Sequence, residues 1–147
     1  MDGDRQNDPR DFACMLELVE GRKCDAVTGL RAVRRDPFVR RVSSRIGNGV
    51  RNWITGDRVQ DAASGIKAFP RALFLAMPRF RGMHRFMATL ARQAGATVLE
   101  VPVNHRPRPA GATKYGIGNR ALRGLADCLA VRWYRSRRLD YAVQEER

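Results

Sequence analysis

The stretch Met-Asp-Gly-Asp-Arg-Gln-Asn-Asp-Pro at residues 1–9 places a candidate site directly before the first predicted helix. In an extended segment, residues two apart share a face, so Asp2, Asp4 and Gln6 present three oxygen-bearing side chains on one side. Carboxylate and amide oxygens suit a hard divalent ion, Mg²⁺ or Mn²⁺, and a diphosphate would complete its coordination. The spacing therefore indicates a metal–diphosphate site.

The same stretch predicts how the chain continues. Asp8 and Pro9 are the residue types of a helix N-cap and first helical position, which predicts a helix over 9–20. A helix cap alone is the simpler interpretation of these acidic residues. It explains Asp8, but it does not explain Asp2, Asp4 and Gln6 at alternating positions. An acidic pair of this kind normally follows a buried strand. None precedes Asp2, so we expect this chain to be the later part of a longer protein.

Composition limits the classes of partner. The chain has 147 residues, 44% of them hydrophobic, enough for one globular core. Its net charge is +13, from 28 basic and 15 acidic residues, and nearly all the basic residues are arginine. A biased genome would produce such a ratio. The functional interpretation is a phosphate-rich partner, namely nucleic acid, an anionic membrane surface or phosphorylated small molecules.

The cysteines and the hydropathy pattern indicate no zinc site, disulfide framework or membrane span. The three cysteines are widely spaced and form no Cys-x-x-Cys pair, which favours a reducing compartment. No signal peptide and no apolar run of about 18 residues is present, so we expect no membrane-spanning helix.

Helical and strand-like periodicities alternate along the chain, which predicts an α/β fold. Pro102 cannot donate to a sheet ladder, so it favours either an edge position for the last strand or the end of that strand. The predicted helices are 9–20, 36–55, 70–76, 84–94 and 117–138. The predicted strands are 24–30 and 96–103, and residues 58–69 are predicted to be a loop that leads into a further strand.

Residues 60–69 place an acid in a loop of small residues. Asp61 is followed by Ala-Ala-Ser-Gly, which leaves space for a ligand beside the carboxylate. Such a carboxylate could accept a proton from an attacking group or orient a substrate hydroxyl. The alternative is an ordinary turn that Asp61 itself caps.

A basic loop is predicted over 104–116, where prolines and glycines exclude regular structure. Arg106, Arg108 and Lys114 could fold over a diphosphate and neutralise it. A solvated basic loop is the alternative, but it leaves the Lys-Tyr-Gly end of the segment unexplained.

The helix predicted over 117–138 is amphipathic. An apolar stripe that includes Leu122, Leu125 and Leu129 is flanked by arginines, with Trp133 near the end. Basic residues with interfacial aromatics suit a helix on an anionic membrane surface. A helix packed on the core with a charged outer face is an equally good interpretation.

Taken together, these motifs resemble family 2 glycosyltransferases of the polyprenyl-phosphate type, such as dolichol-phosphate mannosyltransferase and undecaprenyl-phosphate sugar transferases. The resemblance covers nearly the whole chain, in order. Besides residues 1–9, the matching stretches are GLR at 29–31, DPFVRR at 36–41, SRIGN at 44–48, DAASGIKAF at 61–69, GMHRF at 82–86, VPVNHRPR at 101–108 and TKYG at 113–116.

The resemblance implies a GT-A fold, a nucleotide-binding α/β sandwich. It also implies metal-dependent, inverting transfer of a sugar from a nucleoside diphosphate sugar to a polyprenyl phosphate, with Mg²⁺ or Mn²⁺, on the cytoplasmic side of a membrane. Residues 1–116 would be the carboxyl-terminal portion of that domain, 117–138 a helix suited to a membrane surface, and 139–147 a polar tail.

The resemblance further assigns a role to each candidate residue. Because the acceptor phosphate is already ionised at neutral pH, the carboxylate of Asp61 would position groups first and act as a base second. The implied roles are metal ligands at Asp2, Asp4 and Gln6, donor diphosphate binding at Asp2, Asp4, Arg106 and Lys114, acceptor phosphate binding at Arg31 and Arg45, and catalysis at Asp61.

Two departures limit this expectation. The family's first α/β units, which hold the nucleotide base, are absent, so we expect the isolated chain to be inactive. Thr113 stands where serine is commoner. The rival interpretation is a non-catalytic basic module for nucleic acid or anionic membranes. Its nucleic-acid form is disfavoured, since no nucleic-acid motif or aromatic stacking platform is evident.

Overall fold

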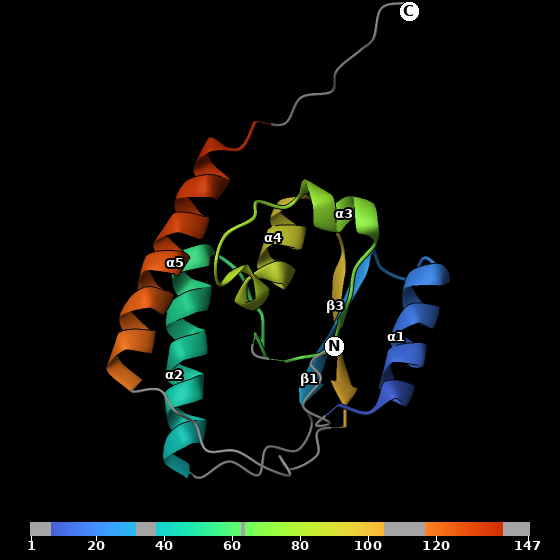
Figure 1. The fold of residues 1–147 in the computed structure, drawn as a ribbon, viewed down its shortest axis with the longest axis horizontal. Coiled ribbons are helices and arrows are strands. Elements are labelled where there is room, and N and C mark those ends of the chain that lie inside the picture. Colours follow the sequence, from blue (N-terminus) through green and yellow to red (C-terminus); the bar gives the residue numbers. More distant parts are fainter. Residues whose placement is uncertain (1–6, 32–37, 63, 105–116, 140–147) are drawn as a thin grey trace, which may run out of the picture.

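The computed structural model describes residues 7–31, 38–62, 64–104 and 117–139, with only the backbone of 38–41 and 117–120. It confirms the predicted mixed α/β class (Figure 1). In chain order the elements are α1 (Pro9–Glu20), β1 (Ala26–Arg31), α2 (Phe38–Thr55), β2 (Lys67–Ala68), α3 (Arg71–Ala76), the 3₁₀ helix η1 (Met83–Arg85), α4 (Met87–Gln93), β3 (Val98–Val103) and α5 (Ile117–Arg137).

The three strands form one sheet in the order β2-β1-β3. β1 and β3 are parallel, in a register that runs from Ala26 opposite Val98 to Arg31 opposite Val103. The short β2 pairs antiparallel with the other side of β1. Within the described residues, β3 is therefore an edge strand, and Pro102 lies next to its last residue, which agrees with both positions that the proline favours.

Helix α1 confirms the sequence prediction at both ends. The Asp8 side chain accepts a hydrogen bond from the Arg10 N–H (3.1 Å), Pro9 opens the helix, and Gly21 follows its last residue. Met15 is fully buried and packs with β-sheet residues such as Val27. Helix α1 thus covers one face of the sheet.

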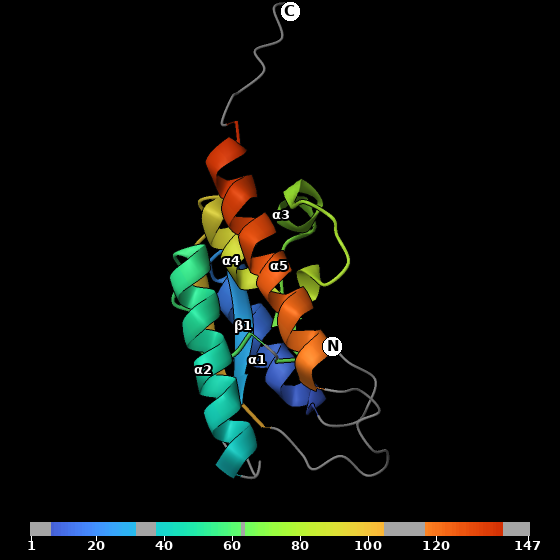
Figure 2. The same ribbon diagram turned by 90° about the vertical axis from the view of Figure 1, so that its left-hand side faces the viewer.

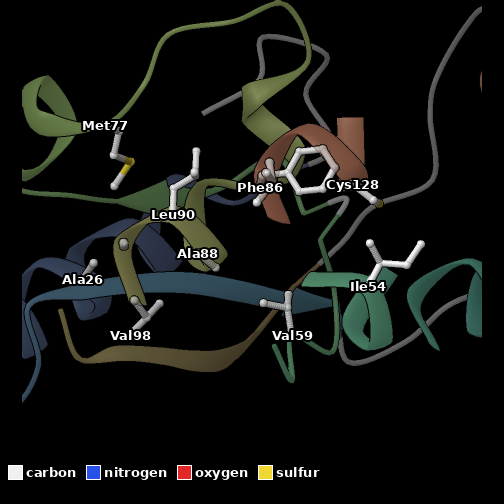
Figure 3. Close-up of a cluster of buried hydrophobic side chains, with 11 residues drawn as sticks. Ala26, Ile54, Val59, Met77, Phe86, Ala88, Leu90, Val98 and Cys128 are labelled. Carbon is white, nitrogen blue, oxygen red and sulfur yellow. The ribbon is translucent and has the colours of Figure 1, made fainter. Parts of the chain in front are cut away.

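The opposite face carries the larger core (Figure 3). Ala26 of β1 and Val98 of β3 meet Leu90 of α4 there, together with Phe86, which precedes α4. Helices α2 and α5 pack side by side next to this layer (Figures 1 and 2). They reach the core through a few residues, such as Ile54.

One predicted helix differs from the structure. Instead of a single helix over 84–94, η1 closes at Phe86 and α4 begins at Met87. Phe86 leaves helical dihedral angles (φ −117°, ψ 3°) while its side chain is almost completely buried. Gly82, with φ of 101°, sets the tight entry to η1.

The apolar stripes of α2 and α5 enter the core only in part, through residues such as Ile54 and Cys128. Ile46 and Trp53 of α2 and Leu122 and Trp133 of α5 are 62%, 80%, 70% and 64% exposed. The side chains that α2 buries include Arg51 and residues near its end. No helix in the described part of the chain is long and apolar enough to cross a bilayer.

Candidate active site

The carboxyl ends of the two parallel strands and the start of α1 meet at one edge of the sheet (Figure 1). Arg31 and Val103, the last residues of β1 and β3, lie opposite each other. Asn104, the next residue, donates from its backbone N–H (2.7 Å) and its side-chain amide (3.1 Å) to the Asp11 carboxylate of α1. Open α/β sheets bind ligands at this edge.

Arg31 and Asp61, predicted separately, form one buried ion pair at this edge. The Arg31 Nε and Nη2 donate to the two carboxylate oxygens of Asp61 at 2.7 and 2.9 Å. The Arg31 backbone N–H also approaches Oδ2, at 3.3 Å. The Asp61 side chain has no exposed surface, and that of Arg31 is 18% exposed.

This geometry favours a positioning role for Asp61. A bidentate guanidinium–carboxylate pair is rigid and directional. Both carboxylate oxygens of Asp61 take part in the pair, which favours a role in orienting Arg31. The turn that the simpler interpretation required is present in the backbone, where the Ser64 N–H points to the Asp61 carbonyl (3.4 Å). The Asp61 side chain nevertheless reaches across to β1.

Residues 57–61, the Asp61 loop, are fixed to α2 by side-chain donors. The Val59 carbonyl accepts from Arg51 Nη2 and Asn52 Nδ2, both at 3.0 Å. The Gln60 carbonyl accepts from Asn48 Nδ2 at 2.9 Å. These bonds satisfy carbonyls that have no partner in a sheet or helix.

The other end of the Asp61 loop is fixed to α4. Asp57 accepts from the Thr89 hydroxyl (2.6 Å) and from Arg92 Nη1 (2.9 Å). Burial works to raise the pKa of the Asp57 carboxyl. Hydrogen bonds from Thr89 and the Arg58 N–H, with the charge and hydrogen bond of Arg92, outweigh burial and lower this pKa below its ordinary value.

A pocket of about 490 Å³ opens between α2 and α5 next to the Asp61 loop. Ala62, the neighbour of Asp61, lines it together with apolar side chains such as Phe86 and Leu122. The Arg51 guanidinium lies in its wall, almost completely buried, and this burial lowers the pKa of Arg51. The pocket therefore combines an apolar lining with a buried cation.

The remaining predicted site residues are not brought to this pair by the described structure. Arg45 lies on the exposed surface of α2 and makes no hydrogen bond or ion pair with Arg31 or Asp61 among the described residues. The other candidates lie outside the described residues, and they are Asp2, Asp4, Gln6, Arg106, Arg108 and Lys114.

The two segments that hold those candidates adjoin this edge. Residues 1–6 directly precede Asn7, which is next to the Asp8 that caps α1, and residues 105–116 follow Asn104. Residues 7–31, 38–62, 64–104 and 117–139 contain no cluster of three His, Cys, Asp or Glu side chains suited to a metal ion. The predicted metal ligands Asp2, Asp4 and Gln6 have the oxygen donors that Mg²⁺ and Mn²⁺ prefer.

Sequence reasoning missed the side chains that fix the Asp61 loop. One signal was present, since Glu100 is the single charged residue in the otherwise apolar stretch 96–103. A carboxylate in such a strand needs a buried partner. The missed residues are Asn48, Arg51, Asn52, Asp57, Thr89, Arg92 and Glu100.

The structure is thus that of an α/β protein with a buried Arg–Asp pair at the carboxyl ends of its parallel strands.

Comparison with known proteins shows which proteins are related to this chain. The chain is 32% identical over 137 residues to a dodecaprenyl-phosphate galacturonate synthase of Rhizobium johnstonii, covering 91% of this chain and 40% of that protein. It is 30% identical over 117 residues to an undecaprenyl-phosphate 4-deoxy-4-formamido-L-arabinose transferase of Edwardsiella ictaluri, covering 80% and 36%. The corresponding transferase of Sodalis glossinidius is 29% identical over 117 residues.

The chain is thus homologous to family 2 glycosyltransferases of the polyprenyl-phosphate type, which confirms the resemblance. It spans 40% and 36% of the length of the first two of these relatives. No family model matches the chain, and no solved structure gives a significant match.

Proposed function

We propose that this chain takes part in transferring a sugar from a nucleoside diphosphate sugar to a polyprenyl phosphate, within a GT-A-type domain. The observation that best supports this proposal is the buried Arg31–Asp61 pair at the carboxyl ends of the parallel strands. Two residues to which the family resemblance assigns roles in the site meet there. The relatives are named as transferases of sugars to dodecaprenyl or undecaprenyl phosphate, which supports this substrate class.

In the proposed reaction, Arg31 and Arg45 bind the acceptor phosphate, and Asp61 orients the Arg31 guanidinium. A phosphate oxygen attacks the anomeric carbon of the sugar while the nucleoside diphosphate leaves from the opposite face, so the configuration inverts. The acceptor is ionised at neutral pH and needs little help from a general base. Binding and orientation of two anions are therefore the main contributions of the protein.

The donor diphosphate would be held by residues of the segments 1–6 and 105–116. Asp2, Asp4 and Gln6 would bind Mg²⁺ or Mn²⁺, which when bound neutralises charge on the leaving diphosphate. Arg106 and Lys114 would pair with the same diphosphate. The Asp11–Asn104 hydrogen bonds support this arrangement, because they join α1 to the residue that precedes the basic loop.

The acceptor lipid and the membrane would lie at α2 and α5. The apolar pocket beside Ala62 could take the first part of a prenyl chain. The exposed apolar side chains of both helices, such as Trp53 and Trp133, suit the interfacial region of a bilayer. In this proposal the protein binds peripherally to the cytoplasmic face of an anionic membrane, and a cytoplasmic location is the alternative.

Titration calorimetry tests this function without requiring turnover. We expect Mn²⁺-dependent binding of GDP or UDP that Asp4→Ala abolishes, and binding of a short prenyl phosphate that Asp61→Ala weakens by at least about tenfold. A purely basic binding module would instead bind anions without Mn²⁺. Asp4→Ala would then leave its affinity unchanged or slightly higher.

A further inference from the structure

Glu100 of β3 reaches the backbone of the Asp61 loop from a distant part of the sequence. Its Oε2 accepts from the Gln60 N–H at 2.9 Å and from the Asp61 N–H at 3.3 Å, residues 40 and 39 positions away. The Glu100 side chain is 7% exposed. A buried carboxylate thus holds the N–H of the residue whose own side chain pairs with Arg31.

The second oxygen of Glu100 connects the same loop at its other end. Oε1 accepts from Arg92 Nη2 at 3.3 Å, and Arg92 Nη1 donates to Asp57 at 2.9 Å. Arg92 therefore balances the charge of two buried carboxylates. Through this connection, β3 and α4 fix the first and last residues of the Asp61 loop relative to each other.

The position of Asp61 is consequently set from two sides. Its carboxylate is fixed by Arg31, and its backbone is fixed by Glu100. Arg31 and Glu100 lie on neighbouring parallel strands, so the sheet itself defines the distance between the two contacts. Without Glu100, the backbone N–H groups of the loop lose their acceptor on β3, while the hydrogen bonds from the loop to α2 remain.

We infer that Glu100 is a positioning residue for the Arg31–Asp61 pair in the proposed sugar transfer, and this inference rests on the function proposed above. Glu100 touches no reacting group in this role. It keeps the Asp61 backbone in the position from which the carboxylate can form its bidentate pair with Arg31. Displacements of about 1 Å in a positioned group can cost about a hundredfold in rate.

Amide hydrogen exchange tests the structural part. We expect exchange at Gln60 and Asp61 to accelerate at least about tenfold in Glu100→Ala, because both N–H groups lose their acceptor. Glu100→Gln keeps one acceptor oxygen and should restore part of the protection. Asp25→Ala is the control, since the Asp25 carboxylate accepts from the Thr97 N–H (2.7 Å) immediately before β1 and β3 begin. It should leave residues 60 and 61 unchanged.

Ligand binding to the full chain tests the functional part. We expect Glu100→Ala to weaken binding of a short prenyl phosphate at least about tenfold, through Arg31, and to leave Mn²⁺-dependent UDP or GDP binding unchanged. Glu100→Gln should recover part of the loss. If Glu100 only stabilised the fold in general, Glu100→Ala would weaken the binding of prenyl phosphate and of the nucleotide to the same extent. Glu100→Gln would then recover the binding of both ligands equally.

The outcomes distinguish the two proposals. If the wild-type chain binds no prenyl phosphate, the proposed function is wrong and the inference falls with it. If the wild type binds and Glu100→Ala binds equally well, the inference alone is overturned. Amides of β1, such as those of Ala26 and Val27, report whether each variant is folded. If Glu100→Ala does not fold, Glu100→Gln decides by the same two measurements.

Discussion

The Asp61 loop and the exposed face of α2 and α5, which carries Trp53 and Trp133, form a contrast. The loop buries charged groups, whereas the helix face exposes apolar ones. Around the loop, Asp57, Asp61 and Glu100 are buried charged groups with short hydrogen bonds. On the outer face of the two helices, large apolar side chains such as Trp53 and Trp133 are mostly exposed. One region holds charges inside the protein, and the other holds apolar groups in solvent.

The comparison separates two sources of free energy. Buried charges are costly unless each is paired, so the loop is stable only as a complete set. Exposed apolar groups cost the fold little, but they gain free energy when another surface covers them. The loop should therefore respond to mutation through stability and the helix face through binding. The following changes test that difference.

The largest effect is expected at the buried ion pair. Asp61→Ala leaves the Arg31 guanidinium without its carboxylate and should lower the free energy of unfolding by about 3–5 kcal/mol in urea titrations. Asp127→Ala removes the partner of Arg85 in a more exposed pair and should cost at most about 1 kcal/mol. Equal losses in the two variants would contradict the buried character of the first pair.

A smaller effect is expected where β1 meets the segment after the loop. A Cβ on Gly29 would lie 2.6–2.8 Å from Ile66, Ser64 and Val103. Gly29→Ala should therefore lower the free energy of unfolding by about 1–3 kcal/mol, measured by urea titration. Gly47→Ala in α2 is the control, because its Cβ meets nothing within 4 Å. It should raise stability by up to about 1 kcal/mol through helix propensity.

The pH dependence of stability should be carried partly by Asp57. Because its folded-state pKa is lowered, Asp57 stabilises the fold above its unfolded pKa of about 3.9, and this contribution disappears as the pH falls through the lower folded value. Asp57→Asn should lose about 1.5 kcal/mol at pH 7. The difference from wild type should shrink below about pH 4 in urea titrations performed across pH. A constant difference down to pH 2 would contradict this assignment.

The smallest effect on stability is expected on the helix face. Trp53→Ser with Trp133→Ser should change the free energy of unfolding by no more than about 0.5 kcal/mol per site, because both side chains are exposed. Binding to phosphatidylglycerol-containing vesicles should fall at least about tenfold. Leu75→Ser on α3 is a control for general loss of exposed apolar area. Unchanged vesicle sedimentation in the double variant would remove the case for a membrane face.

Local signals predicted most of the secondary structure. The cap at Asp8, the proline at Pro9 and Gly21 gave α1 at both ends. The strands begin later than expected, at Ala26 and Val98. There the preceding residues form a connection in which the Asp25 carboxylate accepts from the Thr97 N–H. Such a contact between residues far apart in the sequence cannot be recognised from the local sequence around either residue.

The site was predicted only in part for the same reason. Arg31 and Asp61 were found because their neighbours form motifs, whereas their direct pairing depends on how β1 lies beside the Asp61 loop. Periodicity also could not say which side of α2 and α5 faces the protein, since both helices pack through short stretches near Ile54 and Cys128. The sequence left both environments open for the helix over 117–138. In the structure, Cys128 of its apolar stripe is buried in the core, whereas Leu122 and Leu129 are exposed.

The parallel pairing of β1 with β3 also has a consequence for the order of folding. Asp25 and Thr97, at the start of this pairing, are 72 positions apart, so the chain between them must be closed into a loop before the central strand gains its partner. Non-local pairing of this kind slows folding, typically to milliseconds or longer. During synthesis, the apolar residues of β1 leave the ribosome well before Val98 does. We therefore expect an interval on the nascent chain in which this strand is available to chaperones.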